Sequence, residues 1–170
     1  LLQQGSDTLT KQARFAAVTG EQRYIDAYFE EADVTKTREK ALDALAELGG
    51  DPEALASLKK ALAASVDLMQ TEYYSMRLVE EAMGADETTW PEELRSITLA
   101  PEDESLSSPD KLRKAQELVI SVAYEDAKAA ISREISGSLD TLTKEISDRQ
   151  TQAADTFTMV FRGIVLCSLL

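Results

Sequence analysis

The chain has 170 residues, of which 31 are acidic and 18 are basic, giving a formal net charge of −13 at pH 7. A nucleic-acid-binding protein needs a basic surface, and the sequence shows no basic region, so we expect no nucleic-acid partner. The chain contains no histidine, which removes the most common general base, the usual zinc ligands and histidine-ligated haem.

Other signatures of catalysis and cofactor binding are also missing. The single cysteine, Cys167, lies in an apolar run, so the sequence predicts neither a disulfide framework nor a catalytic thiol. No Walker loop, dinucleotide-binding glycine motif or HExxH motif occurs. Acids such as Glu72, Glu80 and Glu81 invite comparison with di-iron carboxylate proteins, but that site needs Glu-x-x-His motifs. We therefore expect no enzyme activity in this domain, no metal and no cofactor.

A long first helix is expected before the prolines, all four of which lie between residues 52 and 109. Alanine, leucine, glutamate and lysine are abundant, and these residues favour helix. Placed at about 100° per residue, apolar side chains form one stripe from Leu9 to Leu48. This pattern predicts one nearly continuous helix over Ser6–Leu48, with a bend allowed at Gly20, and Gly49-Gly50 ends it.

The remaining chain is expected to alternate between long helices and one irregular segment. Asp51 and Pro52 provide a helix start, and this second helix ends near Gly84. Residues 86–108 contain prolines and many acids, which indicates an extended or one-turn-helical connection. A short helix then runs from Ser108 to Val119 and breaks near Ser121. The final helix carries an unbroken apolar stripe from Tyr124 to Val160.

Both termini are predicted to lie next to a membrane. Residues 157–170 carry one charge, Arg162, and are too few to span a bilayer, so they resemble the first half of a transmembrane helix. Leu1-Leu2 resembles the tail of a preceding span. We therefore assign residues 1–160 to an extracytoplasmic helical-bundle domain and residues 161–170 to the start of a truncated transmembrane helix. The alternative is a soluble protein whose apolar C-terminal helix packs in its own core.

If both ends enter the same face of a membrane, the chain must cross the bundle an even number of times. We therefore predict an all-α fold: an elongated antiparallel up-down helical bundle of the four-helix type. Residues 86–119 would form its short, irregular third leg. A three-helix bundle, with residues 86–119 as a side excursion, is the alternative.

A short motif in the first helix resembles a known class of domains. Residues 12–30 have the sequence QARFAAVTGEQRYIDAYFE, with the pattern Thr19, Gly20, Glu21, Tyr24, Ile25 and Tyr28. This pattern resembles the first helix of extracytoplasmic helical sensor domains. These include the CHASE-type and four-helix-bundle domains of histidine kinases, diguanylate cyclases and chemoreceptors. The resemblance implies sensing of a ligand or partner outside the membrane, usually by a homodimer, and an output inside. It brings no ligand-binding motif with it.

The predicted function is therefore the extracytoplasmic, ligand-binding domain of a bacterial transmembrane signal-transduction receptor in the cell membrane. Its last helix would pass a conformational change to a cytoplasmic output domain. The alternative is a membrane-anchored helical adaptor or structural module that binds protein partners and no small molecule.

Two groups of residues are candidates for specific roles. Phe15, Val18, Ile25 and Phe29 lie roughly opposite the apolar stripe of the first helix, which favours a homodimer interface. Alternatively, the irregular segment covers this face.

Charged side chains on the apolar stripes form the second group, because a buried charge needs a partner. Glu80 and Arg149 are predicted to form a buried ion pair. Arg38 lies at a height close to Tyr124, and together with Glu31 these residues are candidates for binding a carboxylate ligand. Alternatively, Arg38 pairs with Glu31 or is solvated at the edge of the bundle.

Overall fold

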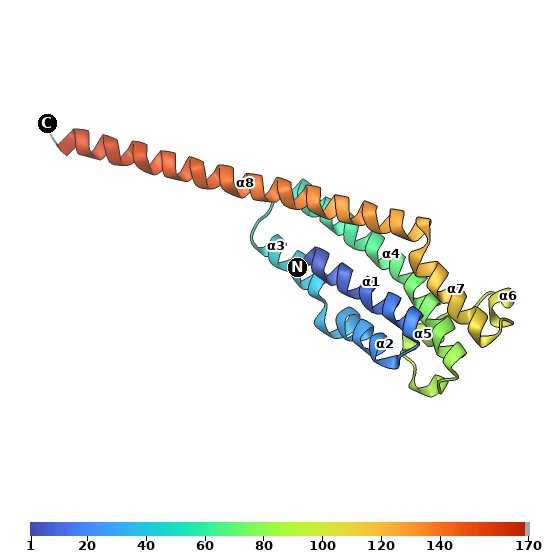
Figure 1. Ribbon diagram of the computed structural model, residues 1–170. Coiled ribbons are helices and arrows are strands. Elements are labelled where there is room, and N and C mark those ends of the chain that lie inside the picture. The colour runs from blue at the N-terminus through green and yellow to red at the C-terminus, as the bar shows by residue number, and fades with distance from the viewer. Residues whose placement is uncertain (169–170) are drawn as a thin grey trace.

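A computed structural model describes the backbone of residues 1–168 and the side chains of residues 1–160. These residues are all-helical, without a strand, which confirms the predicted fold class at this level (Figure 1). The elements in chain order are α1 (Leu2–Thr19), α2 (Gln22–Phe29), the π-helix η1 (Glu30–Thr35), α3 (Thr37–Glu47), α4 (Pro52–Met83), the 3₁₀-helix η2 (Glu87–Thr89), α5 (Glu92–Ser96), α6 (Pro101–Glu104), α7 (Ser108–Ile120) and α8 (Val122–Ser168).

The predicted single helix over Ser6–Leu48 is wrong, because the chain reverses at Gly20. Gly20 adopts φ 68°, a left-handed conformation that glycine reaches without steric cost, and its N–H donates to the carbonyl of Ala16 at 2.8 Å. From this turn α2 runs back along α1, and α3 continues in the same direction (Figure 1). A second left-handed residue, Lys36 at φ 50°, separates η1 from α3.

This reversal also changes which face of the chain is buried. Residues after Gly20 no longer follow the phase of α1, so Ile25 and Phe29 are buried at 1% and 8% exposure instead of lying on an outer face. Phe15 and Val18, on α1 itself, remain exposed at 41% and 65%. The four predicted interface residues therefore do not share one surface, and Ile25 and Phe29 cannot contact a second subunit without unfolding.

Local signals placed the other helices correctly. The Asp51 carboxylate accepts from the N–H of Ala54 at 2.8 Å and caps α4, which ends at Gly84 in a left-handed conformation as predicted. The predicted short helix is α7, and the chain bends at Ser121 before α8 starts. Because α7 packs on α4 and leads directly into α8, residues 86–119 do not form a separate third leg.

The bundle contains two apolar cores. The aromatic core lies toward the Gly20 turn, and the aliphatic core lies toward the N-terminus. The aromatic core consists of Leu9, Ala13, Ala16, Ala17, Ile25, Tyr28, Phe29, Met69, Tyr73, Met76, Leu78, Val79, Leu94, Leu99, Ala115 and Val119. The aliphatic core consists of Leu2, Ala41, Leu42, Ala54, Leu58, Ala61, Ile131, Ile135 and Leu142.

Helix α8 extends far beyond the bundle, from the end at which the N-terminus also lies (Figure 1). Its predicted apolar stripe packs as expected as far as Leu142, which is 3% exposed. From Ile146 to Val160 every residue of α8 is exposed. The predicted start of a membrane helix, residues 161–170, lies outside the residues whose side chains are described. No helix within the described part of the chain has an apolar stretch long enough to cross a membrane.

Candidate functional site

Buried polar residues occur where the chain passes from one core to the other. On α1, Ser6 lies between Leu9 of the aromatic core and Leu2 of the aliphatic core. The same order occurs in the other long segments, with Arg38 between Phe29 and Ala41, Ser65 between Met69 and Ala61, and Tyr124 between Val119 and Ile131. We call Ser6, Thr10, Arg38, Ser65 and Glu72, with the hydroxyls of Tyr28 and Tyr124, the polar layer; Thr10, Tyr28 and Glu72 lie on its aromatic-core side.

Glu72 is the centre of the polar layer. Its side chain projects from the middle of α4 and is only 2% exposed. The hydroxyl of Tyr28 on α2 donates to Glu72 Oε2 at 2.6 Å, and the hydroxyl of Tyr124 on α8 donates to Glu72 Oε1. The hydroxyls of Tyr124 and Thr10 on α1 are also hydrogen-bonded, at 3.3 Å. The Glu72 carboxylate thus joins α4 to α2 and α8, and Tyr124 extends the network to α1.

The protonation of this cluster depends on its burial. Burial raises the pKa of Glu72, while the hydrogen bonds from Tyr124 and Tyr28 and the positive charges of Arg38 and Lys128 oppose that shift. Burial and the adjacent carboxylate raise the pKa of Tyr28 and of Tyr124 well above their ordinary value. Both phenols therefore stay protonated and act as donors.

Arg38, predicted to contact a ligand, is enclosed within the protein at 3% exposure. Its guanidinium donates to Ser65 Oγ at 2.8 Å and to Glu39 Oε1 at 3.1 Å. Arg38 and Tyr124 have different hydrogen-bond partners, and the carboxylate that Tyr124 binds is the protein's own Glu72. The cavity beside Arg38 measures about 10 Å³, which is room for one water molecule at most. A ligand-binding role for both residues stays a prediction.

Glu31 supports the backbone next to Arg38. Its carboxylate accepts from the backbone N–H and the hydroxyl of Thr37, both at 3.0 Å, and so caps the start of α3. Gly5 of α1 lies against this corner. A Cβ on Gly5 would lie 2.7 Å from Arg38 Cγ and 3.2 Å from Glu31 Oε1, so only glycine lets α1 approach this closely.

The predicted buried ion pair between Glu80 and Arg149 does not form. Arg149 pairs with Glu145 one turn earlier on α8, and its side chain is 63% exposed. Glu80 is buried near the opposite end of the bundle, where burial raises its pKa and a hydrogen bond from Gln22 opposes the shift. The two heights were matched on the assumption of an unbroken first helix, and the reversal at Gly20 removes that assumption.

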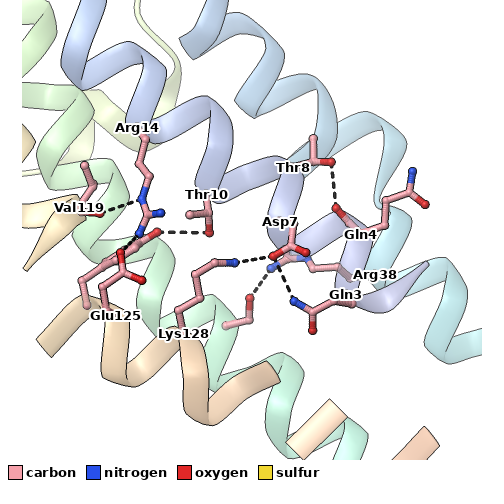
Figure 2. Close-up of polar contacts among 12 residues, drawn as sticks. Gln3, Gln4, Asp7, Thr8, Thr10, Arg14, Arg38, Val119, Glu125 and Lys128 are labelled. Atoms are coloured by element: carbon pink, nitrogen blue, oxygen red, sulfur yellow. Dashed lines mark hydrogen bonds and ion pairs between the residues drawn. The ribbon is translucent and has the colours of Figure 1, made fainter. Parts of the chain in front are cut away.

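Ion pairs on the surface join α1 to the start of α8 (Figure 2). Arg14 donates to the carbonyl of Val119 at 3.0 Å, pairs with Glu125, and places its guanidinium 5.3 Å from the centre of the Tyr124 ring. Nearer the N-terminus, Lys128 pairs with Asp7 at 2.6 Å. These contacts link α8 to α1 on the surface beside Thr10 and Tyr124 of the polar layer.

Glu72, Tyr28 and Thr10 were not predicted as site residues. A signal for Glu72 was present, since it lies seven residues from both Ser65 and Val79 and shares their helical face. Comparisons with family models, curated proteins and solved structures find no match to this chain. Among the residues with described side chains there is no group of three or more potential metal ligands.

Proposed function

We propose that the chain is the extracytoplasmic sensing domain of a bacterial transmembrane receptor, and that α8 carries the signal. The observation that supports this proposal most is the continuity of α8 over 47 residues. This helix begins beside the polar layer at Tyr124, passes along the aliphatic core and continues beyond the bundle. One rigid element thus connects the most polar part of the interior with the apolar C-terminal residues.

The proposed signal is a small displacement of α8 relative to α1. Packed helices slide or rotate by about 1–2 Å in signalling transitions, and a stiff helix passes such a step along its length. The ion pairs of Arg14 and Lys128, which join the two helices, define their relative position. A ligand shifts this position only if it binds one arrangement more tightly than the other.

The arrangement of the helices as four legs of a bundle is part of the same proposal. We take α1 as the first leg of a four-helix up-down bundle, α2 to α3 as the second, α4 as the third, and α7 with α8 as the fourth. The packing of α1 against α2, α3, α4 and α7 supports this arrangement. Homodimerisation also remains proposed, with exposed Phe15 and Val18 as the remaining members of the predicted interface.

Location can be tested in intact cells that produce the full-length protein. We would replace exposed Lys59 on α4 with cysteine in a Cys167→Ser background and add a membrane-impermeant maleimide. Labelling without permeabilisation is expected. Labelling that requires lysis of the inner membrane would place this domain in the cytoplasm and end the proposal.

Transmission can be tested by inserting one residue next to Gly137 in the full-length protein. The insertion rotates the rest of α8 by about 100° relative to the bundle and is expected to lock or abolish the output. As a control, an insertion of seven residues in place of one adds close to two whole turns, so it keeps the phase of α8 and should preserve signalling. Normal regulated output from the one-residue insertion would show that α8 does not carry the signal.

A second candidate function is a helical adaptor that binds protein partners only. The small size of the cavity beside Arg38 favours it, because no small-molecule ligand fits there. The two functions require different coding sequences downstream of α8 in the gene. A kinase, cyclase or chemotaxis signalling domain beyond residue 170 supports sensing, whereas a stop soon after the apolar segment supports the adaptor.

A further inference from the structure

A surface groove with a volume of about 330 Å³ lies between α1 and the start of α8. It is lined by Asp7, Thr10, Lys11, Arg14, Phe15 and Lys128. Sites for small ligands begin at about this size. Figure 2 shows Arg14, Thr10 and Asp7 on one side and Lys128 on the other. A molecule in the groove would therefore touch both helices whose relative position we propose as the signal.

The charge of this groove is opposite to that of the whole chain. Its lining contains three cationic side chains and one carboxylate, Asp7, and the Glu125 carboxylate pairs with Arg14 beside it, which leaves an excess of one positive charge in a protein with a net charge of −13. Lys11 has no ion-pair partner among the described side chains, and its ammonium lies 5.8 Å from the centre of the Phe15 ring. Lys11 can therefore bind an anion without breaking an existing ion pair.

The groove also has an apolar component. Phe15 is 41% exposed, and the alkyl portions of Lys11 and Arg14 add to the apolar surface. An inorganic anion would interact with the cationic side chains and leave the apolar surface in contact with water. A compact organic anion would interact with the cations and also cover the apolar surface.

Behind the groove lies the polar layer. Thr10 lines the groove and is hydrogen-bonded to Tyr124, which donates to the buried Glu72. An anion that attracts Lys128 competes with Asp7 for it, and among the described side chains the Asp7–Lys128 pair is one of two ionic links between α1 and α8. A ligand in the groove would therefore alter an ion pair that links α1 to α8.

A larger hollow of about 400 Å³, between the start of α4 and α8, has the wrong charge for such a ligand. Its lining contains Asp51, Glu53 and Glu134 against one cation, Arg133. The sign of the charge therefore favours the groove between α1 and α8 over this larger hollow.

We propose that this groove binds a small organic carboxylate, with Lys11, Lys128 and Arg14 holding the carboxylate group and Phe15 contacting the apolar body. The inference rests on the proposed sensing function, and it names the class of ligand and the site.

The test is a titration of the ¹⁵N-labelled chain with benzoate, monitored by amide chemical shifts. Benzamide is the neutral comparator, and inorganic phosphate is the anion without an apolar body. Saturable shifts with benzoate are expected in residues 7–15 and 122–128. The Lys11→Gln and Lys128→Gln substitutions should each weaken binding by about tenfold. Lys60→Gln, outside the groove, should leave it unchanged.

Lys11→Gln is the decisive variant, because Lys11 forms no ion pair that the substitution could break. The proposal is overturned if benzoate and benzamide bind equally, if phosphate binds as tightly as benzoate, if the shifts map elsewhere or do not saturate, or if Lys11→Gln binds like wild type. These results are independent of the maleimide experiment. Loss of the site with an extracytoplasmic location overturns only the ligand assignment, and a cytoplasmic location with benzoate binding overturns only the sensing function.

Discussion

The two apolar cores of the bundle differ in how firmly they fix the helices around them. In the aromatic core, Tyr28, Phe29 and Tyr73 pack ring against ring with centroids 5.4–5.9 Å apart. The aliphatic core has only Leu, Ile and Ala among its buried members, and surface hollows of about 310 and 250 Å³ lie beside it. Small aliphatic side chains leave more room for a neighbouring helix to move than interlocked rings do.

This difference bears on where movement is to be expected. The described apolar side chains that α8 contributes to a core all belong to the aliphatic core, whereas those of α7 belong to the aromatic core. The end of the bundle that contains the Gly20 turn is therefore expected to act as a fixed base. The end from which α8 projects is expected to adapt.

Truncating one isoleucine in each core is the most direct test of this difference in rigidity. Ile25→Ala, in the aromatic core at 1% exposure, should lower the free energy of unfolding by about 3–5 kcal/mol. Ile131→Ala, which borders the 310 Å³ hollow, should cost only about 2 kcal/mol because its surroundings can relax. Urea denaturation measures both values. Equal costs, or a larger cost at Ile131, would contradict the proposed difference in rigidity.

The polar layer can be tested at Glu72, which accepts two of its buried hydrogen bonds. Glu72→Ala removes the acceptor for the hydroxyls of Tyr28 and Tyr124, and each unsatisfied buried group costs about 1–3 kcal/mol. We expect a total loss of about 2–4 kcal/mol, because removing a buried carboxylate also removes its desolvation cost. Asp67→Ala, exposed on the same helix, is the control and should change stability by less than about 0.5 kcal/mol. Equal losses of unfolding free energy in the two variants would show that the hydrogen bonds to Glu72 do not stabilise the fold.

The close approach of α1 to Arg38 gives a matched pair of glycine substitutions. Gly5→Ala places a methyl group 2.7 Å from Arg38 Cγ, and we expect a loss of about 1–3 kcal/mol as α1 shifts. Gly137→Ala meets nothing within 4 Å in α8 and should raise stability by about 0.5–1 kcal/mol. Thermal or urea unfolding measures both. A neutral Gly5→Ala would mean that the corner at Arg38 is looser than described.

The smallest expected effect is a pH dependence that belongs to Glu72. Burial raises its folded-state pKa above the unfolded value. The stabilising contribution of the protonated side chain is therefore fully present below the unfolded pKa and is lost as the pH rises through the folded pKa. Relative to Glu72→Gln, wild type should gain stability as the pH falls from neutrality toward the ordinary glutamate range. Both proteins contain all the other acids, so the difference between their free energies of unfolding at each pH cancels the contributions of those acids. The opposite slope would show that the tyrosine hydrogen bonds outweigh burial.

The features that the sequence predicted correctly depend on neighbouring residues. The start of α4 is set by Asp51 and Pro52, its end by Gly84, and the bend before α8 by the change of apolar phase near Ser121. The reversal at Gly20 was missed because glycine permits either a bent helix or a turn. Burial of Ile25 in the aromatic core decides between them, and that is a tertiary interaction.

The candidate site was harder to predict for the same reason. Arg38 and Tyr124 were found from their positions on apolar stripes, and both lie in the polar layer. Glu72 was not singled out among the many acids because its partners, Tyr28 and Tyr124, are 44 and 52 residues away in the sequence. Such pairs become visible only once the order of the legs is known, and the unpredicted turn at Gly20 changed that order.

Helix α8 is one element by geometry, but it divides into two by resistance to amide hydrogen exchange. Up to Leu142 its amides lie against the bundle, so they should exchange only when the bundle opens. From Ile146 to Val160 the same helix is exposed on every side, and an isolated helix of this length is marginal in water. Protection in the separate domain should therefore fall steeply within about two turns after Leu142. Anything that orders this segment in the intact protein, whether a membrane or a second chain, should be visible as recovered protection there.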